Sequence, residues 1–284
     1  MGRWRKLGII AGGGALPLRI AAACKARGEE FHMIRLSGYA DANLSALPGD
    51  DCAIGEAGKV LRILKAQQCD AIVFAGLVKR PDFKSLRVDW RGAAMLPRLV
   101  AAAARGDGAL LDVLIQSVES DGFVVVGVEE AVESLLAPAG ALGEIAPDAQ
   151  DQEDIRKAAR VIAALGPFDI GQGAVVATGL VVAVEAAEGT DEMLARCTTL
   201  LKDLGGDPYA GVLVKRPKPG QELRVDLPTI GPETVRRAAK AGLKGIAVNA
   251  GAALIIDLEE VVSLANERKL FIYGFLESEV AGPS

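Results

Sequence analysis

Short apolar runs alternate with helical patterns along the first half of the chain, and this alternation constrains the fold more than any other feature. The runs have the length of buried strands, and the segments between them carry helical periodicity. Strands that alternate with helices in this way indicate βαβ units, and therefore a doubly wound, Rossmann-like domain with a parallel sheet. The expected strands are residues 6–11, 31–36, 69–75 and 123–128, and the expected helices are 15–27, 56–67 and 93–104.

The second half has its own pattern. Residues 135–150 contain two prolines and little periodicity, so we expect an N-terminal domain at 1–136, a linker at 137–150 and a C-terminal domain at 151–284. The order of elements in the C-terminal domain does not repeat the first half, which predicts a distinct, mixed α/β fold. Strands are expected at 173–186, 210–216, 245–251, 253–257 and 270–275, and helices at 151–165, 191–204, 231–241 and 258–268.

Composition excludes several classes of protein. With 284 residues, half of them hydrophobic, the chain can bury a core in each of two domains. A net charge of −5 argues against a nucleic acid partner, and no uninterrupted apolar span of 18 residues suggests a membrane helix. The four cysteines form no C-x-x-C pair and there is one histidine, which argues against a zinc site and for reduced thiols in the cytoplasm.

The first strand ends in three glycines, Gly12, Gly13 and Gly14, and a helix is expected to begin near Leu16. Glycines let a ligand approach the backbone, and a helix N-terminus offers free N–H groups to an anion, so the loop is a candidate phosphate or nucleotide cradle. A tight turn that packs the helix is the equally weighted alternative. The dinucleotide fingerprint is incomplete, because Pro17 stands where its third glycine belongs.

Three further charged residues of the first half are candidates. Lys79 and Arg80 follow the third strand, where loops of a doubly wound sheet line the ligand crevice, and their charges suit phosphates. A solvated charge pair at a turn is the competing interpretation. Asp107 lies between two glycines ahead of an apolar helix, and there it either caps the helix or belongs to a site.

A proline-rich basic loop at 212–234 is the strongest candidate in the second half. It contains Lys215, Arg216, Arg224 and Asp226 among four prolines. Prolines stiffen a loop, and a stiff basic loop with one aspartate suits a phosphate-rich ligand whose charge is shared with a cation.

Carboxylates gather just after the apolar run that ends near residue 184. Thr190 and Asp191 fit the start of a helix, as a cap and as an acidic first turn. Glu185 instead falls among buried apolar neighbours, so Glu185 or Glu188 needs a cationic partner or a metal ion. Mg²⁺ fits such oxygen ligands together with substrate phosphates, and general-base work would fall to a carboxylate.

Seven motifs, spread in order over nearly the whole chain, resemble the LpxI family of UDP-2,3-diacylglucosamine pyrophosphatases. They are "IAGGGALP", "GLVKRP", "RGDGALL", "DIGQGAVV", "AVEAAEGTDEMLAR", "LVKRPKPGQELRVDLPTIGPET" and "VNAGAALIID". The resemblance implies hydrolysis of the substrate pyrophosphate to UMP and 2,3-diacylglucosamine 1-phosphate (lipid X), in lipid A biosynthesis. It also implies two domains with the active site in the cleft between them, and a divalent cation, Mg²⁺ with Mn²⁺ or Co²⁺ as substitutes.

The resemblance also implies roles for the candidate residues. Asp226 matches the essential acid of the family. The expected catalytic residues are Asp226, Glu188 and Lys215, and the expected metal ligands are Asp226, Glu185 and Asp191. Substrate contacts are expected from Gly12, Gly13, Gly14, Leu16, Lys79, Arg80, Asp107, Thr190, Arg216, Arg224 and Thr229.

The resemblance further implies a cytoplasmic protein, in peripheral contact with the inner membrane because its substrate is acylated, and is compatible with a homodimer. Two alternatives of other classes stay open at this point. One is an NAD(P)-dependent oxidoreductase, suggested by the first βα unit. The other is a protein that binds a nucleotide sugar or a lipid without turning it over.

Overall fold

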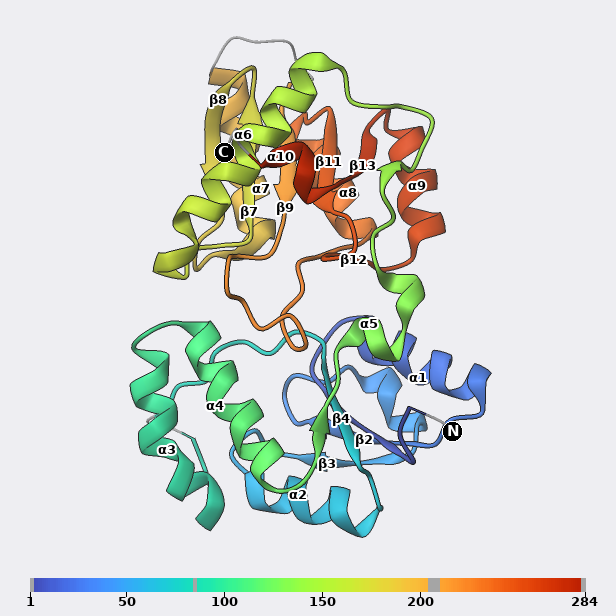
Figure 1. Cartoon of the computed structure of the whole chain (residues 1–284), viewed down its shortest axis with the longest axis vertical. Coiled ribbons are helices and arrows are strands. Elements are labelled where there is room, and N and C mark those ends of the chain that lie inside the picture. Colours follow the sequence, from blue (N-terminus) through green and yellow to red (C-terminus); the bar gives the residue numbers. More distant parts are fainter. Residues whose placement is uncertain (1–2, 84–85, 204–209, 282–284) are drawn as a thin grey trace. The chain divides into compact units, whose positions relative to one another are not determined.

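The computed structural model describes residues 3–83, 86–203 and 210–281. The chain divides between Ser134 and Leu135 into two compact units, each built around its own sheet (Figure 1). The segment predicted as a linker, 137–150, lies within the second unit. It supplies the short strand β6 (Gly140–Ala141) and the start of helix α6 (Ala149–Leu165).

The first unit contains a five-stranded sheet in the order β3-β2-β1-β4-β5, and every neighbouring pair is parallel. This order and direction confirm the predicted Rossmann-like domain. The strands are β1 (Leu7–Ala11), β2 (Phe31–Leu36), β3 (Gly49–Cys52), β4 (Ala71–Ala75) and β5 (Val124–Val125). The helices are α1 (Leu16–Arg27), α2 (Ala57–Ala66), α3 (Trp90–Ala103), α4 (Asp107–Ser120) and α5 (Val128–Ala131).

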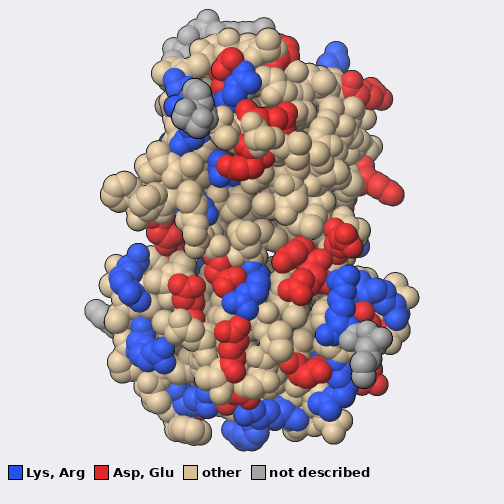
Figure 2. Space-filling view, viewed as in Figure 1, with Lys and Arg blue, Asp and Glu red and all other residues tan. Residues whose placement is uncertain are grey.

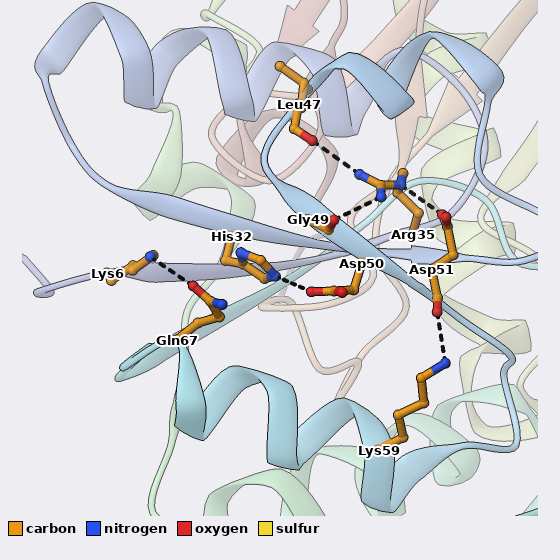
Figure 3. Close-up of polar contacts among 9 residues, drawn as sticks. All are labelled: Lys6, His32, Arg35, Leu47, Gly49, Asp50, Asp51, Lys59 and Gln67. Atoms are coloured by element: carbon orange, nitrogen blue, oxygen red, sulfur yellow. Dashed lines mark hydrogen bonds and ion pairs between the residues drawn. The ribbon is translucent and has the colours of Figure 1, made fainter.

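Strand β3 was not predicted, because its residues, Gly-Asp-Asp-Cys, show no apolar alternation. Hydrogen-bonded side-chain pairs with β2 hold it at the edge of the sheet (Figure 3). His32 Nε2 lies 2.8 Å from Asp50 Oδ2, and Arg35 Nε donates to Asp51 Oδ1 at 2.8 Å. Lys59 of α2 adds a hydrogen bond of 3.0 Å to the Asp51 carbonyl. Acidic side chains on an edge strand also discourage pairing with a second sheet.

The second unit contains a six-stranded mixed sheet in the order β6-β13-β11-β9-β7-β8, and a separate parallel pair, β10 and β12. The prediction of a distinct mixed α/β fold is therefore confirmed. The further strands are β7 (Gly173–Ala177), β8 (Leu180–Val184), β9 (Val212–Lys215), β10 (Thr229–Ile230), β11 (Gly245–Asn249), β12 (Leu254–Ile255) and β13 (Phe271–Phe275). The further helices are α7 (Gly189–Asp203), α8 (Pro232–Ala241), α9 (Leu258–Glu267) and α10 (Glu277–Val280).

Alternate residues of the central strands of this sheet enter two different cores. Val175 of β7 and Leu213 of β9 pack with residues of α7, α8 and α9. Their neighbours Ala174, Val212 and Val214 pack with residues of α6 and α10. Successive strand residues point to opposite faces, so a strand buried on both sides requires an almost continuous apolar run. This explains why β7, which is buried along its whole length, is entirely apolar.

A two-residue turn at Thr178 and Gly179 joins β7 to β8. Both residues have positive φ, 49° and 83°, which is the signature of the type I′ turns that suit β-hairpins. The buried Asp154 of α6 accepts hydrogen bonds from both turn N–H groups, at 2.8 and 2.7 Å. The helix therefore holds the hairpin in place, and the hairpin brings the start of β7 beside the end of β8.

Candidate active site in the second unit

Three strand ends meet at one edge of the mixed sheet. Because β7 runs antiparallel to both β8 and β9, the residues that enter β7 lie beside those that leave the other two strands. Gly173 is in register with Lys215, and the Glu185 N–H donates to the Gly173 carbonyl at 2.8 Å. The Arg216 N–H donates to the Gln172 carbonyl at 3.1 Å. This edge holds the carboxyl ends of β8 and β9, the position at which α/β sheets bind ligands.

Asp226 lies in the loop that follows β9, and two glutamine amides hold its carboxylate. Gln172 Nε2 donates to both oxygens, at 2.9 Å to Oδ1 and 2.8 Å to Oδ2. Gln221 Nε2 donates to Oδ2 at 2.7 Å and to the Asp226 carbonyl at 2.5 Å. The plane of the carboxylate is therefore set from two sides.

The environment of Asp226 raises the pKa of its carboxyl above the ordinary value of 3.8. Burial is the largest cause, because it disfavours the charged form. The hydrogen bond from Gln172 and the positive charges of Lys218 and Lys215 act in the opposite direction, and the negative charge of Asp169 adds to the rise. Asp226 is consequently a stronger base than an ordinary aspartate.

Lys215, the last residue of β9, is 7% exposed, and its ammonium group lies next to Thr190 and Glu185. Lys215 Nζ donates to Thr190 Oγ1 at 2.7 Å, and Thr190 Oγ1 donates to Glu185 Oε1 at 2.9 Å. Lys215 Nζ is also 3.9 Å from Glu185 Oε2. Glu185 thus has the cationic partner that its burial required.

The loop between Lys215 and Asp226 is folded onto the site by its own polar groups. Lys218 forms an ion pair with Asp169, and its backbone N–H donates to Gln221 Oε1 at 2.8 Å. That bond orients the Gln221 amide so that its nitrogen faces Asp226. The stiff basic loop expected from the sequence is therefore an ordered support for the aspartate.

The other predicted residues of the basic loop lie in separate pairs. Arg216 Nη2 donates to Glu277 Oε1 at 3.0 Å. Arg224 makes a two-pronged contact with Glu222, at 3.0 and 2.7 Å. Thr229 begins β10, and its hydroxyl donates to the Leu227 carbonyl at 3.0 Å.

Two further predicted carboxylates, Glu188 and Asp191, each form an ion pair with an arginine. Glu188 is exposed and pairs with Arg196 of α7 at 2.9 Å. Asp191 lies in the first turn of α7, where an acidic residue favours the helix dipole, and is 3.5 Å from Arg237 of α8. Within residues 3–83, 86–203 and 210–281, no group of three or more His, Cys, Asp or Glu side chains is placed to hold a metal ion.

The glycine loop of the first unit packs against the segment after β4. Gly13 N donates to the Leu77 carbonyl at 2.9 Å, and Leu77 N returns a bond of 2.8 Å. A Cβ on Gly12 would lie 2.6 Å from the Leu77 carbonyl oxygen, so this glycine is required by close backbone approach. Gly14 has φ of 89° and donates to Asp41 Oδ2 at 2.9 Å just before α1 begins at Leu16.

The structure brings together two other predicted residues of the first unit. Arg80 Nη1 is 3.7 Å from Asp107 Oδ1, and Arg80 Nη2 donates to the Ala103 carbonyl at the end of α3. Asp107 is the first residue of α4, and Gly106 occupies the cap position. Lys79 is exposed.

Sequence reasoning assigned no role to Gln172 or Gln221. Both lie in motifs that carry the family resemblance, and each follows a glycine in a loop. Neutral amides have no charge pattern or ligand spacing to mark them, so only the fold reveals that both nitrogens face one carboxylate.

A Rossmann-like unit joined to a mixed α/β unit, with a clamped, partly buried aspartate at the edge of the second sheet, defines a class of two-unit α/β proteins. The model of the LpxI N-terminal domain matches residues 6–135, and that of the LpxI C-terminal domain matches residues 138–273. The chain belongs to the LpxI family.

A relative from Caulobacter vibrioides, named UDP-2,3-diacylglucosamine pyrophosphatase LpxI, is 48% identical over 272 residues, which cover 95% of this chain and 97% of the relative. Two solved structures have low similarity to the chain. An N5-carboxyaminoimidazole synthase from Aspergillus clavatus has a TM-score of 0.25 at 11% identity, over 71% of this chain and 43% of its own. A putative epimerase from Burkholderia cenocepacia has a TM-score of 0.31 at 13% identity, over 99% and 86%.

Two general features of the described chain concern its charged surface and its helices. On the face drawn in Figure 2, basic and acidic side chains are interspersed. None of the helices in the described part of the chain is long and apolar enough to cross a membrane.

Proposed function

We propose that the chain hydrolyses the pyrophosphate of UDP-2,3-diacylglucosamine to UMP and 2,3-diacylglucosamine 1-phosphate, in lipid A biosynthesis and with Mg²⁺ as cofactor. The observation that carries the proposal is the 48% identity, over 95% of the chain, to a protein named for this activity. The site supports it independently, since a clamped aspartate beside a buried lysine suits the chemistry of a phosphate anhydride.

The donor set around Asp226 fits one divalent cation. Its carboxylate accepts three hydrogen bonds from Gln172 and Gln221, and a carboxylate has about four acceptor positions. Among the described residues these bonds leave one acceptor position of Asp226 open. Mg²⁺ is commonly held by one or two carboxylates together with substrate phosphates, so one such position is sufficient. When bound, the ion would neutralise negative charge on the phosphates.

The chain's own side chains supply the remaining chemistry. Asp226 has a raised pKa and is therefore suited to take a proton from water that attacks the anhydride. The Lys215 ammonium and the Arg216 guanidinium are suited to phosphate oxygens, and they would stabilise charge as the phosphorus–oxygen bond breaks. Cytoplasmic location, contact with inner-membrane lipid and a homodimer remain predictions that accompany this proposal.

The test is release of UMP from UDP-2,3-diacylglucosamine by the full chain. We expect EDTA to abolish the release and added Mg²⁺ to restore it. Asp226→Ala should lower kcat by at least about 100-fold, the scale seen when one group that stabilises developing charge is removed. Asp112→Ala, at an exposed position of α4, is the matched control and should leave the rate unchanged. Near-normal release by Asp226→Ala would refute the role of this residue.

A further inference from the structure

Glu185 was expected to bind a metal ion, but its contacts assign it a different task. We infer that Glu185, acting through Thr190, is a positioning residue that holds the Lys215 ammonium toward the phosphates of the substrate. The inference rests on the proposed function, because it names how one cation of that site is oriented.

The backbone register brings these three side chains together. Lys215 ends β9, Glu185 follows β8, and Gly173 of β7 lies between them. Gly173 has no side chain to separate the two charges. A Cβ at that position would lie 2.6 Å from Glu185 Oε2. The glycine therefore lets the carboxylate reach across one strand to within 3.9 Å of Lys215 Nζ.

The hydrogen bonds have one consistent direction. An ammonium group has only donors, so Thr190 Oγ1 must accept from Lys215 Nζ, at 2.7 Å. The Thr190 hydroxyl is then left to donate its own proton to Glu185 Oε1, at 2.9 Å. Thr190 thus links the carboxylate to the ammonium and fixes the orientation of both. A valine of similar size would lose both bonds.

The burial of Glu185 Oε2 strengthens its attraction to the Lys215 ammonium. This oxygen is buried and has no hydrogen-bond partner in the described part of the chain, so the nearby ammonium balances its charge. Leaving a buried carboxylate without a compensating charge is costly. The side chains of Lys215 and Glu185 are only 9% and 13% exposed, so solvent screens the pair weakly.

The same geometry makes Glu185 a poor ligand for Mg²⁺. A divalent cation on Oε2 would be placed close to the Lys215 ammonium, and like charges at such a separation repel strongly in a buried site. Oε1 already accepts the Thr190 hydroxyl. Asp226, in contrast, is clamped by neutral amides, and within the described residues it keeps an open acceptor position.

The variants Thr190→Val and Glu185→Gln test the inference in the full chain. Three quantities are measured for each: kcat and KM for UMP release, the Mg²⁺ concentration that gives half-maximal rate, and the calorimetric affinity for inorganic pyrophosphate. Thr198→Val, which removes a hydroxyl bonded to the Leu194 carbonyl on the same helix, is the matched control. Far-UV circular dichroism checks that each variant is folded.

We expect Thr190→Val and Glu185→Gln each to lower kcat/KM and pyrophosphate affinity by about tenfold or more, the scale of one lost hydrogen bond to a charged group. Because both act through Lys215, the double variant should lose little more than either single variant. The Mg²⁺ midpoint should stay close to that of wild type, since neither variant removes a ligand or a group bonded to Asp226. Thr190→Ser, which keeps the hydroxyl, should recover most of the activity.

Different failures have different meanings. If Glu185→Gln raises the Mg²⁺ midpoint while Thr190→Val behaves as wild type, Glu185 is a metal ligand and the inference is overturned. If both variants match Thr198→Val in rate and in pyrophosphate affinity, the hydrogen-bonded link has no function, and the inference is likewise overturned. A wild-type chain that binds pyrophosphate but releases no UMP would refute the proposed function, and pyrophosphate affinity would still decide the role of Glu185.

Discussion

At the scale of single residues, the site depends on how opposing effects act on one carboxyl group. Burial raises the pKa of Asp226, whereas the Gln172 amide and two lysine charges lower it. Neutral amides can hold the ionised carboxylate without fully neutralising it, so the group keeps both a defined orientation and useful basicity. A salt bridge at the same place would make Asp226 a weaker base.

Gln172→Leu isolates the amide contribution. The substitution removes the donor that contacts both carboxylate oxygens, so the charged form of Asp226 loses stabilisation and its pKa rises further. If the ionised form is the active one, the acidic limb of the kcat/KM profile moves to higher pH. The shift is measured from the rate of UMP release over a pH range of about two units on either side of neutrality.

Gln116→Leu, at an exposed position of α4, is the control for this change and should leave the profile in place. A shift of the limb to lower pH in Gln172→Leu would contradict the assignment of that limb to Asp226. So would a profile that keeps its shape and only loses amplitude, because the glutamine would then support the fold without tuning the carboxyl.

The residues of the site differ in how far the sequence could predict them. The cost of burying a lone carboxylate indicated a partner for Glu185, and Lys215 is that partner. Asp226 was singled out by its basic, proline-rich loop and by family resemblance. Gln172 and Gln221 could not be singled out, since 49 residues separate them in the chain and only strand register and loop folding bring both amides to one acceptor.

At the scale of elements, the β7–β8 hairpin sets the geometry of the site's edge. Its first turn residue, Thr178, has φ of 49°, a region that β-branched residues rarely adopt. The contacts from Asp154 compensate for this conformation by accepting both turn N–H groups. The hairpin is therefore held by a tertiary contact rather than by its own turn sequence.

Thr178→Asn should stabilise the chain, because Asn-Gly is a preferred type I′ turn and asparagine adopts positive φ readily. We expect a gain of about 1 kcal/mol in the free energy of unfolding, part of the cost of a left-handed conformation. Thr199→Asn, on the exposed face of α7, lacks such a conformation and is the control. Thermal unfolding of the three chains measures the effect, and an equal or lower midpoint for Thr178→Asn would contradict it.

The sequence predicts a strand well where the strand is a continuous apolar run. Strands buried along most of their length, such as β1, β2, β4 and β11, appear in the sequence as apolar runs and were predicted at nearly their observed positions. The run predicted as strand at 173–186 is a hairpin of two strands, β7 and β8. Strand β3 was missed because it has no apolar run, and hydrogen-bonded side-chain pairs with β2 help to hold it. The run at 123–128 was overpredicted, because only Val124 and Val125 pair with β4 before α5 begins at Val128.

At the scale of the whole molecule, the two units have separate hydrophobic cores. One cluster of the first unit contains Ile34, Leu64, Ile72 and Phe123, and two clusters of the second unit are built from residues after Ser134. Elements with their own cores can unfold independently, and two-state behaviour is then not expected. The distribution of tryptophan makes this testable, since Trp4 and Trp90, the two tryptophans of the chain, both belong to the first unit.

Asp154→Ala should therefore separate the unfolding transition of the second unit from that of the first. The substitution leaves the N–H groups of Thr178 and Gly179 without their acceptor, which should destabilise the second unit by about 1–3 kcal/mol. In a urea titration, the midpoint followed by far-UV circular dichroism should fall, while the midpoint followed by tryptophan fluorescence should stay at its wild-type value because that signal arises in the first unit. If both midpoints fall together, the units unfold as one cooperative body, and a ligand bound by the second unit would then stabilise the first as well.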